Sequence, residues 1–100
     1  MKDNRRLNNI KANEEVTENI RTILLQQAEG FLNEAKSYYE KYNSETDEVL
    51  KRGAGDMFQI MYGKTCACYN NMKALGIISE NEEYTIILQA FERATGVKML

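Results

Sequence analysis

The stretch Leu75-Gly76-Ile77-Ile78-Ser79-Glu80-Asn81-Glu82 (residues 75–82) shows most clearly how this chain folds. Gly76 can adopt the left-handed conformation that ends a helix, and Ile77 can make the apolar contact that accompanies it. Ser79 and Glu82 have the spacing of a capping box, in which each side chain binds a free backbone N–H at the start of a helix. The stretch therefore predicts the end of one helix and the start of another.

The helix that follows this boundary is expected over residues 80–95. Its apolar residues return every three or four positions, which is the pattern of a helix with one buried face. Gly96 would end this helix, and Arg93 would lie near its negative C-terminal end. The residues predicted to face the core are Tyr84, Ile87, Leu88, Phe91 and Ala94.

The helix before the boundary is expected over residues 46–75. It would begin after Asn43-Ser44-Glu45-Thr46-Asp47, because these residues prefer turns and helix caps. The sequence leaves two alternatives at Gly53-Ala54-Gly55, since Asp56 and Gln59 have the spacing of another capping box. A break there would give four helices. We favour one continuous helix, because the apolar stripe keeps its phase across the glycines.

A first, longer helix is predicted over residues 14–43. Asn13 is a good N-cap residue, and the glutamates at positions 14, 15 and 18 would place negative charge at the positive end of the helix dipole. Gly30 indicates a bend or the close approach of another helix backbone. The apolar face recurs at the helical period and comprises Val16, Ile20, Leu24, Ala28, Phe31, Ala35, Tyr38 and Tyr42.

These elements predict an all-α fold, an antiparallel bundle of three helices with four as the alternative. The chain has 100 residues, which is the length of one domain. We expect residues 13–100 to form that domain. Residues 1–12 carry four basic side chains against one acid, so we expect them to form a flexible basic arm.

The composition argues against an enzyme. The chain contains no histidine, which is the commonest catalytic acid and base at neutral pH. Cys66 and Cys68 are two residues apart on a helix, so their thiols point in different directions and offer neither a disulfide nor a zinc site. We therefore expect no catalytic residue, no cofactor and no metal.

The sequence also argues against a membrane protein. No apolar run reaches the roughly 18–20 residues needed to cross a bilayer, and the start of the chain is polar. A cytoplasmic protein is expected. Small acidic helical proteins of this kind are common among the accessory, regulatory and inhibitor proteins of bacteria and their phages, which is an analogy of class alone.

Nucleic-acid binding is an alternative that would depend on the basic arm. Arg5, Arg6 and Lys11 are the candidate contacts with phosphates. Two observations argue against this function. The last helix begins with Glu80-Asn81-Glu82-Glu83, and the net charge of the chain is −2, so no broad basic surface is predicted.

Binding to another protein is the function that the sequence favours. The chain has six tyrosines, and tyrosine is enriched at protein interfaces. Long helices would also expose more apolar surface than one short helix can cover, so we expect self-association into a homo-oligomer. The candidate contact residues are Tyr38, Tyr39 and Tyr42 on the first helix and Tyr62 and Tyr69 on the second.

Overall fold

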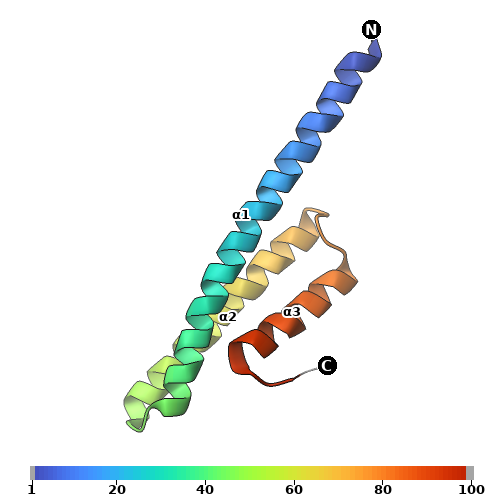
Figure 1. Ribbon diagram of the computed structural model, residues 1–100. Coiled ribbons are helices and arrows are strands. Elements are labelled where there is room, and N and C mark those ends of the chain that lie inside the picture. Colours follow the sequence, from blue (N-terminus) through green and yellow to red (C-terminus); the bar gives the residue numbers. More distant parts are fainter. Residues whose placement is uncertain (1, 99–100) are drawn as a thin grey trace.

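The chain folds into three helices in the computed structural model, which describes the backbone of residues 2–98 and the side chains of residues 14–98. These helices are α1 (Lys2–Ser44), α2 (Glu48–Ala74) and α3 (Glu80–Thr95). Residues 2–98 contain no strand. α1 and α2 form an antiparallel hairpin, and α3 folds back along α2 (Figure 1). The predicted all-α bundle of three helices is confirmed.

The start of α1 differs from the prediction. The helix begins at Lys2 instead of after Asn13, so the predicted N-cap and the three glutamates that follow it lie inside a continuous helix. Asparagine and glutamate can lie within a helix as well as at its start, because capping is only one of the roles that their side chains fill. The side chains of residues 1–12, which we expected to form the basic arm, lie outside the described side chains.

The turn between α1 and α2 is closed by Asp47. Its carboxylate oxygen Oδ1 accepts hydrogen bonds from the backbone N–H groups of Val49 at 3.0 Å and Leu50 at 3.1 Å. This satisfies two of the free donors that every helix start has. α2 then continues through residues 53–55 without a break, so the alternative with four helices is wrong.

The turn between α2 and α3 follows the predicted chemistry closely. Gly76 adopts a left-handed conformation with φ of 73°. Its N–H donates to the carbonyl of Lys73, and the N–H of Ile77 donates to the carbonyl of Met72, both at 2.9 Å. This pair of bonds is the Schellman motif. The hydroxyl of Ser79 then caps α3 by accepting a hydrogen bond from the N–H of Glu82 at 3.1 Å.

The core lies where all three helices meet, and several of its residues are small. Alanines from α1 and α3 are fully or almost fully buried, which lets the helix backbones approach closely. The hydroxyl of Thr65 is also buried and donates to the carbonyl of Met61 at 3.0 Å. The buried apolar cluster consists of Ala28, Leu32, Cys68, Tyr69, Met72, Ile78, Ala90 and Ala94.

The start of α3 buries a different residue from the one predicted. Tyr84 is 67% exposed, whereas the neighbouring Glu83 is only 5% exposed. The Glu83 carboxylate forms an ion pair with Lys73 of α2 at 2.9 Å. A buried charge requires such a partner. The apolar pattern alone did not indicate this, because it counts only apolar side chains.

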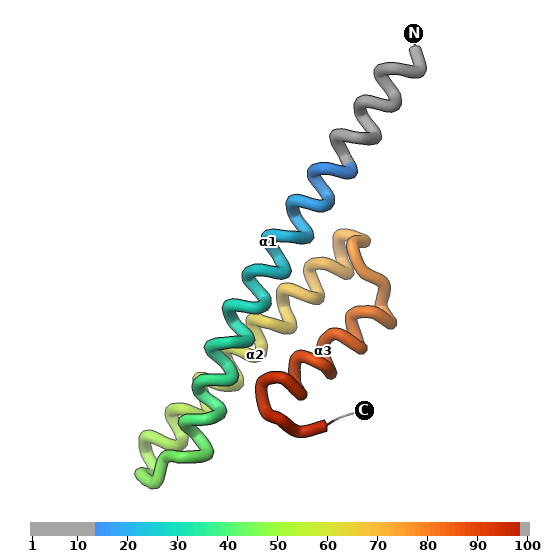
Figure 2. The backbone as a smooth tube through the Cα atoms, viewed as in Figure 1, coloured from blue at the N-terminus to red at the C-terminus, as the bar shows by residue number. Residues whose placement is uncertain are grey.

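The molecule is long and narrow. It measures 70 × 24 × 16 Å, and its radius of gyration is 18.2 Å, compared with about 13 Å for a compact chain of this length. α1 causes this shape, because it continues well past the end of α2 (Figures 1 and 2).

The close approach of another helix backbone, one of the two alternatives predicted at Gly30, is wrong, since a Cβ there would meet no atom within 4 Å.

Candidate functional site

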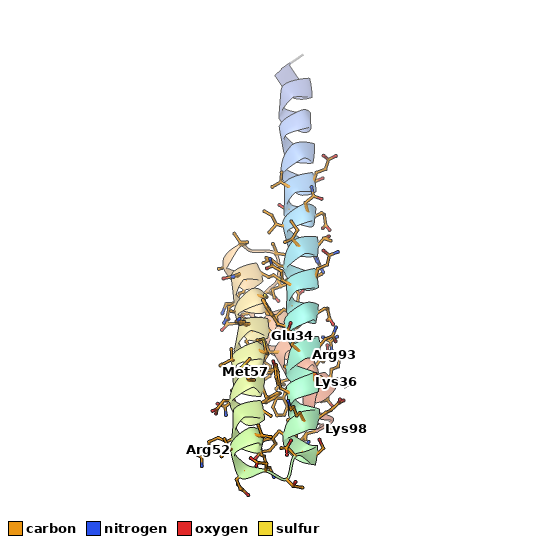
Figure 3. The ribbon with its side chains drawn as sticks, turned by 90° about the vertical axis from the view of Figure 1, so that its left-hand side faces the viewer. Glu34, Lys36, Arg52, Met57, Arg93 and Lys98 are labelled. Atoms are coloured by element: carbon orange, nitrogen blue, oxygen red, sulfur yellow. The ribbon has the colours of Figure 1, made fainter. Side chains whose placement is uncertain are left out.

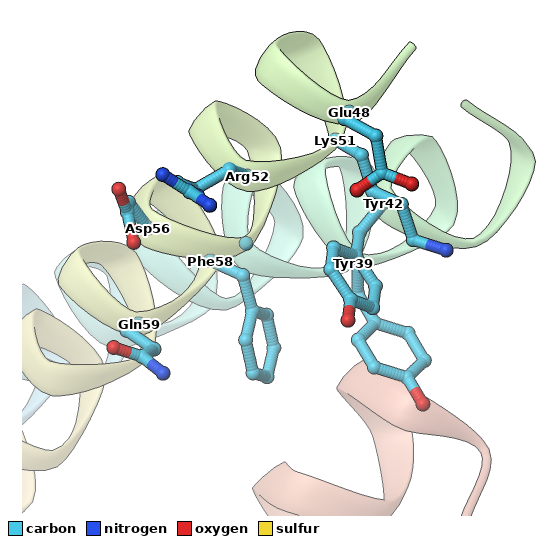
Figure 4. Close-up of a pocket in the computed structure, with 9 residues that line it drawn as sticks. Tyr39, Tyr42, Glu48, Lys51, Arg52, Asp56, Phe58 and Gln59 are labelled. Carbon is cyan, nitrogen blue, oxygen red and sulfur yellow. The ribbon is translucent and has the colours of Figure 1, made fainter. Parts of the chain in front are cut away.

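A groove lies at the end of the molecule where α1 turns into α2. It encloses about 520 Å³ between the last turns of α1 and the first turns of α2. The rings of Tyr39, Tyr42 and Phe58 project from both helices toward the same side (Figure 4). The lining residues are Tyr39, Tyr42, Glu48, Lys51, Arg52, Gly55, Asp56, Phe58 and Gln59.

Gly55 allows the Tyr42 ring to approach α2 closely. A Cβ at Gly55 would stand 3.1 Å from Cδ2 and 3.3 Å from Cε2 of Tyr42. These separations are shorter than an ordinary carbon–carbon contact. The absence of a side chain at position 55 therefore positions Tyr42, which stays 38% exposed.

Charged groups of both signs surround the rings. The ammonium of Lys51 lies 5.1 Å from the centre of the Tyr42 ring, which is within the range of a cation–π contact. Arg52 and Asp56 lie on one side of the rings, and Glu48 lies with Lys51 on the other (Figure 4). The groove thus combines an aromatic floor with two basic and two acidic groups at its edge.

The inner wall of the groove is continuous with the core through a chain of aromatic rings. Tyr39 contacts Phe58 at 5.2 Å, Phe58 stacks on Tyr62 at 5.9 Å, and Tyr62 meets Phe91 of α3 edge to face at 5.7 Å. The hydroxyl of Tyr62 donates to the carbonyl of Ile87 at 3.1 Å. This chain ties α3 to the inner wall of the groove.

Burial changes the acidity of Tyr62 at the inner end of that chain. Removal from water raises the pKa of its phenol above the ordinary value, and the nearby Cys66 thiol raises it further. The phenol therefore stays protonated and keeps donating its hydrogen bond in neutral and mildly alkaline solution.

The structure separates the five tyrosines that the sequence grouped as candidate contacts. Tyr39 and Tyr42 line the groove, and Tyr38 is half-buried on α1 outside the groove lining. Tyr62 is half-buried and hydrogen-bonded to α3. Tyr69 is 1% exposed, so it is part of the core of the protomer. The sequence shows that Tyr62 and Tyr69 are seven residues apart and share a face of α2, but it does not show that α3 covers that face.

Sequence reasoning missed most of the other groove residues. The apolar spacing along α2 does not distinguish Phe58 from its neighbours, and Gly55 stands out in the sequence as part of a possible helix break. Lys51 and Arg52 gave no signal, because isolated charges on a helix are ordinary surface residues. Only the pairing of α2 with the end of α1 places these residues beside the two tyrosines.

The other candidate groups of the sequence analysis are also placed. Cys66 and Cys68 are free thiols, and burial raises the pKa of both, which favours the protonated form over the reactive thiolate. The candidate nucleic-acid contacts Arg5, Arg6 and Lys11 lie outside the described side chains.

Wider comparisons do not add a second site. Within the described residues, no three side chains of the metal-binding types gather at one point, and no helix has the length and apolar character of a membrane span. Comparison of the chain with protein families, curated proteins and solved structures found no match. The groove is therefore interpreted from its own geometry.

Proposed function

We propose that this protein is a non-catalytic helical interaction module that binds another protein through the groove at the turn between α1 and α2. The observation that carries the proposal is the aromatic floor made by the exposed Tyr42 and the half-buried Tyr39 and Phe58, with charged side chains at its edge. Tyrosine and arginine are among the residues that most often dominate the binding energy of protein interfaces.

The fixed position of the rings supports this function. A side chain that is already held in place loses little conformational entropy when a partner binds. Tyr42 is held between Gly55 and the Lys51 ammonium, and Tyr39 is held by its ring contact with Phe58. A partner would therefore meet a surface that is prepared for contact.

The shape and charge of the groove indicate the kind of segment that it would accept. An apolar or aromatic side chain of the partner would cover the three rings and displace water from them. Polar groups on each side of that chain would meet Lys51 and Arg52 or Glu48 and Asp56. This combination of one apolar anchor with neighbours of both signs is typical of a protein segment.

The same charges favour a protein over a nucleic acid as the partner. Phosphate backbones are bound by an excess of basic side chains. In the groove, the two basic residues Lys51 and Arg52 are matched by the two acidic residues Glu48 and Asp56. The groove therefore offers no net positive charge to a phosphate.

A comparison of three versions of the full-length chain tests this function. The immobilised wild-type chain, a Tyr42→Ala variant and a Tyr84→Ala variant are used to capture proteins from cells that express the protein naturally. Tyr84 provides the matched control, because it is an exposed tyrosine on α3 outside the groove. Each captured protein is then purified, and its affinity for the three versions is measured.

We expect Tyr42→Ala to weaken the affinity of a captured partner by about tenfold or more, because the anchoring ring is lost. Tyr84→Ala should bind like the wild-type chain. Equal affinity of all three versions for every captured protein would contradict the proposal.

A further inference from the structure

α3 covers only part of α2. The two helices have 16 and 27 residues, so they are about 24 Å and about 40 Å long. α3 lies beside the half of α2 that is farther from the turn between α1 and α2 (Figure 1). Within the described residues, the half of α2 nearer that turn packs against α1 and has no third helix beside it.

α3 contacts one stripe of α2. The ring of Phe91 meets the ring of Tyr62, and the carboxylate of Glu83 pairs with Lys73. Tyr62 and Lys73 are eleven residues apart, and eleven steps along a helix return to within about 20° of the same direction. These two residues therefore mark the stripe of α2 that faces α3.

The same stripe continues into the groove. Gly55 and Lys51 lie seven and eleven residues before Tyr62, so both lie within about 20° of its direction on α2. Both residues line the groove. The aromatic rings follow the same path, since Phe58 stacks on Tyr62 at 5.9 Å. The groove is thus the continuation of the space that α3 fills.

The end of α3 leaves this continuation open. Thr95 is the last residue of α3, one turn after Phe91, so the helix ends about level with Phe58 of α2. Figure 3 shows that Arg52 of α2 lies nearer than Arg93 of α3 to the turn between α1 and α2. The groove residues that precede Phe58 in α2 therefore lie beyond the end of α3.

Residues 96–98 do not fill the space beyond α3. Gly96 adopts a left-handed conformation with φ of 75°, and the chain after it turns away from α1 and α2 (Figure 1). None of residues 80–98 lines the groove. From Phe58 to Glu48, the stripe therefore has no helix on it over ten residues, or about 15 Å, which is the length of a helix of about three turns.

The charges along the groove fit a helix in this position. Glu48, Arg52 and Asp56 line the groove at steps of four residues, so acidic, basic and acidic side chains follow one another about 6 Å apart along α2. Side chains four residues apart form the ridges through which helices pack together. A neighbouring helix would match all three charges with basic, acidic and basic residues at positions i, i+4 and i+8.

The helix ends on either side of the free space favour one direction. The C-terminal end of α3 carries partial negative charge, and the N-terminal end of α2 carries partial positive charge. A helix that continues in the direction of α3 would place its positive N-terminus against the first of these ends and its negative C-terminus beside the second. The reverse direction would bring like charges together at both ends.

We propose that the groove accepts an amphipathic helix of a partner protein, which stacks end to end on α3 and extends the three-helix packing to the turn between α1 and α2. Its apolar face covers the three rings of the groove floor. Its flank carries basic, acidic and basic residues level with Asp56, Arg52 and Glu48. The proposal rests on the function proposed for the groove, and it states the form and direction of the bound segment.

Two synthetic peptides of the same composition test the form of the segment. The helical peptide, of about 14 residues, places leucines at the helical period and lysine, glutamate and lysine at i, i+4 and i+8 on the flank. In the control peptide, apolar and polar residues alternate. We expect the full-length chain to bind the helical peptide at least about tenfold more tightly, with a gain in helical circular dichroism on mixing. Tyr42→Ala should remove about tenfold of this affinity.

A charge exchange tests the register. Arg52→Glu should weaken the helical peptide by about threefold to tenfold, because the central glutamate of the peptide then meets a like charge. A peptide with lysine in place of that glutamate should recover binding to this variant. Arg21→Glu is the matched control, since Arg21 is exposed and lies 18 residues before Tyr39, or about 27 Å along α1.

Photoreactive groups test the direction. A group at the N-terminus of the helical peptide should cross-link to the last turn of α3, and a group at its C-terminus should cross-link to the first turn of α2. Mass spectrometry of the digested products locates both cross-links. Exchange of the two positions would overturn the proposed direction.

Three further results would overturn the proposal. The helical peptide could bind no more tightly than the control peptide, it could bind without a gain in helix, or the lysine peptide could fail to recover binding to Arg52→Glu. The function of the groove is tested separately, by the affinity of captured proteins for Tyr42→Ala. A captured protein that depends on Tyr42, together with a helical peptide that does not bind, would leave the function standing and refute the helical form of the partner.

Discussion

Tyr42 and Gly55 show how a single side chain can determine the shape of a site. The ring of Tyr42 lies 3.1–3.3 Å from the place that a Cβ would take at position 55. Two residues earlier, Gly53 has open space around it. Replacement of either glycine by alanine would thus add the same methyl group in two different surroundings on one helix.

Replacement of these glycines by alanine should give different changes in stability. Gly53→Ala should raise the free energy of unfolding by roughly 0.5–1 kcal/mol, because alanine favours the helix and nothing obstructs its methyl group. Gly55→Ala should gain less, since the Tyr42 ring must move. Urea denaturation measures both. In a Tyr42→Ala background, where no ring obstructs the methyl group, Gly55→Ala should raise the free energy of unfolding by more than it does in the wild-type chain. An equal gain in the two backgrounds would contradict the contact between Tyr42 and position 55.

The hydroxyl of Tyr62 provides a second prediction at this scale. Tyr62→Phe removes the hydrogen bond to the Ile87 carbonyl but keeps the stacked ring, so the free energy of unfolding should fall by about 1 kcal/mol. Urea denaturation of the variant checks this value. Tyr84→Phe is the control, because Tyr84 is exposed and its loss of a hydroxyl should change little.

At the scale of the element, the turn between α2 and α3 depends on the left-handed backbone of Gly76. An alanine there would strain the turn, whereas an alanine at Gly30 inside α1 would meet no neighbour. Gly76→Ala should therefore lower the free energy of unfolding by about 1–2 kcal/mol, and Gly30→Ala should raise it by about 1 kcal/mol. Thermal unfolding of both variants should show shifts of opposite sign, and shifts of the same sign would disprove the assignment.

The same elements show how much of the fold could be predicted from the sequence. The two turns were predictable, because Asp47, Gly76 and Ser79 act on backbone groups close to them in the chain. The start of α1 was not, since several good cap residues compete there and local chemistry does not choose among them. Glu83 was also missed, because its burial depends on Lys73 from another helix.

The groove could be predicted only in part for the same reason. Tyr39 and Tyr42 were predicted as contact residues because tyrosine is enriched at protein interfaces, and both line the groove. Tyr69 has the same chemistry, yet it is buried by the packing of α3. Residue type indicates what a side chain can do, but the arrangement of the helices decides whether it is accessible.

At the scale of the whole molecule, the groups with shifted acidity among the described side chains respond to alkali in the same way. Burial raises the pKa of Tyr62, Tyr69, Cys66 and Cys68, and the ion pair with Glu83 raises the pKa of Lys73. The folded chain therefore holds these protons at a pH where the unfolded chain has released them. A raised pKa gives stability that is present below the unfolded value and is lost as the pH increases above it.

The protein should accordingly become less stable in alkaline solution. The ordinary pKa is 9.0 for the thiols and 10.0 for the phenols, so these groups should not change stability below about pH 8. Above pH 9, the urea midpoint should fall steadily. Tyr62→Phe should reduce this fall, and a midpoint that stays constant from pH 8 to pH 11 would contradict the role of these groups.

The length of α1 has a consequence for how the molecule would work in a cell. The groove lies where α1 turns into α2, and Val16 lies 26 residues before Tyr42, or about 39 Å along the helix. A partner bound in the groove would therefore leave this part of α1 uncovered. Two different proteins could then be held on one chain at the same time, about 39 Å apart.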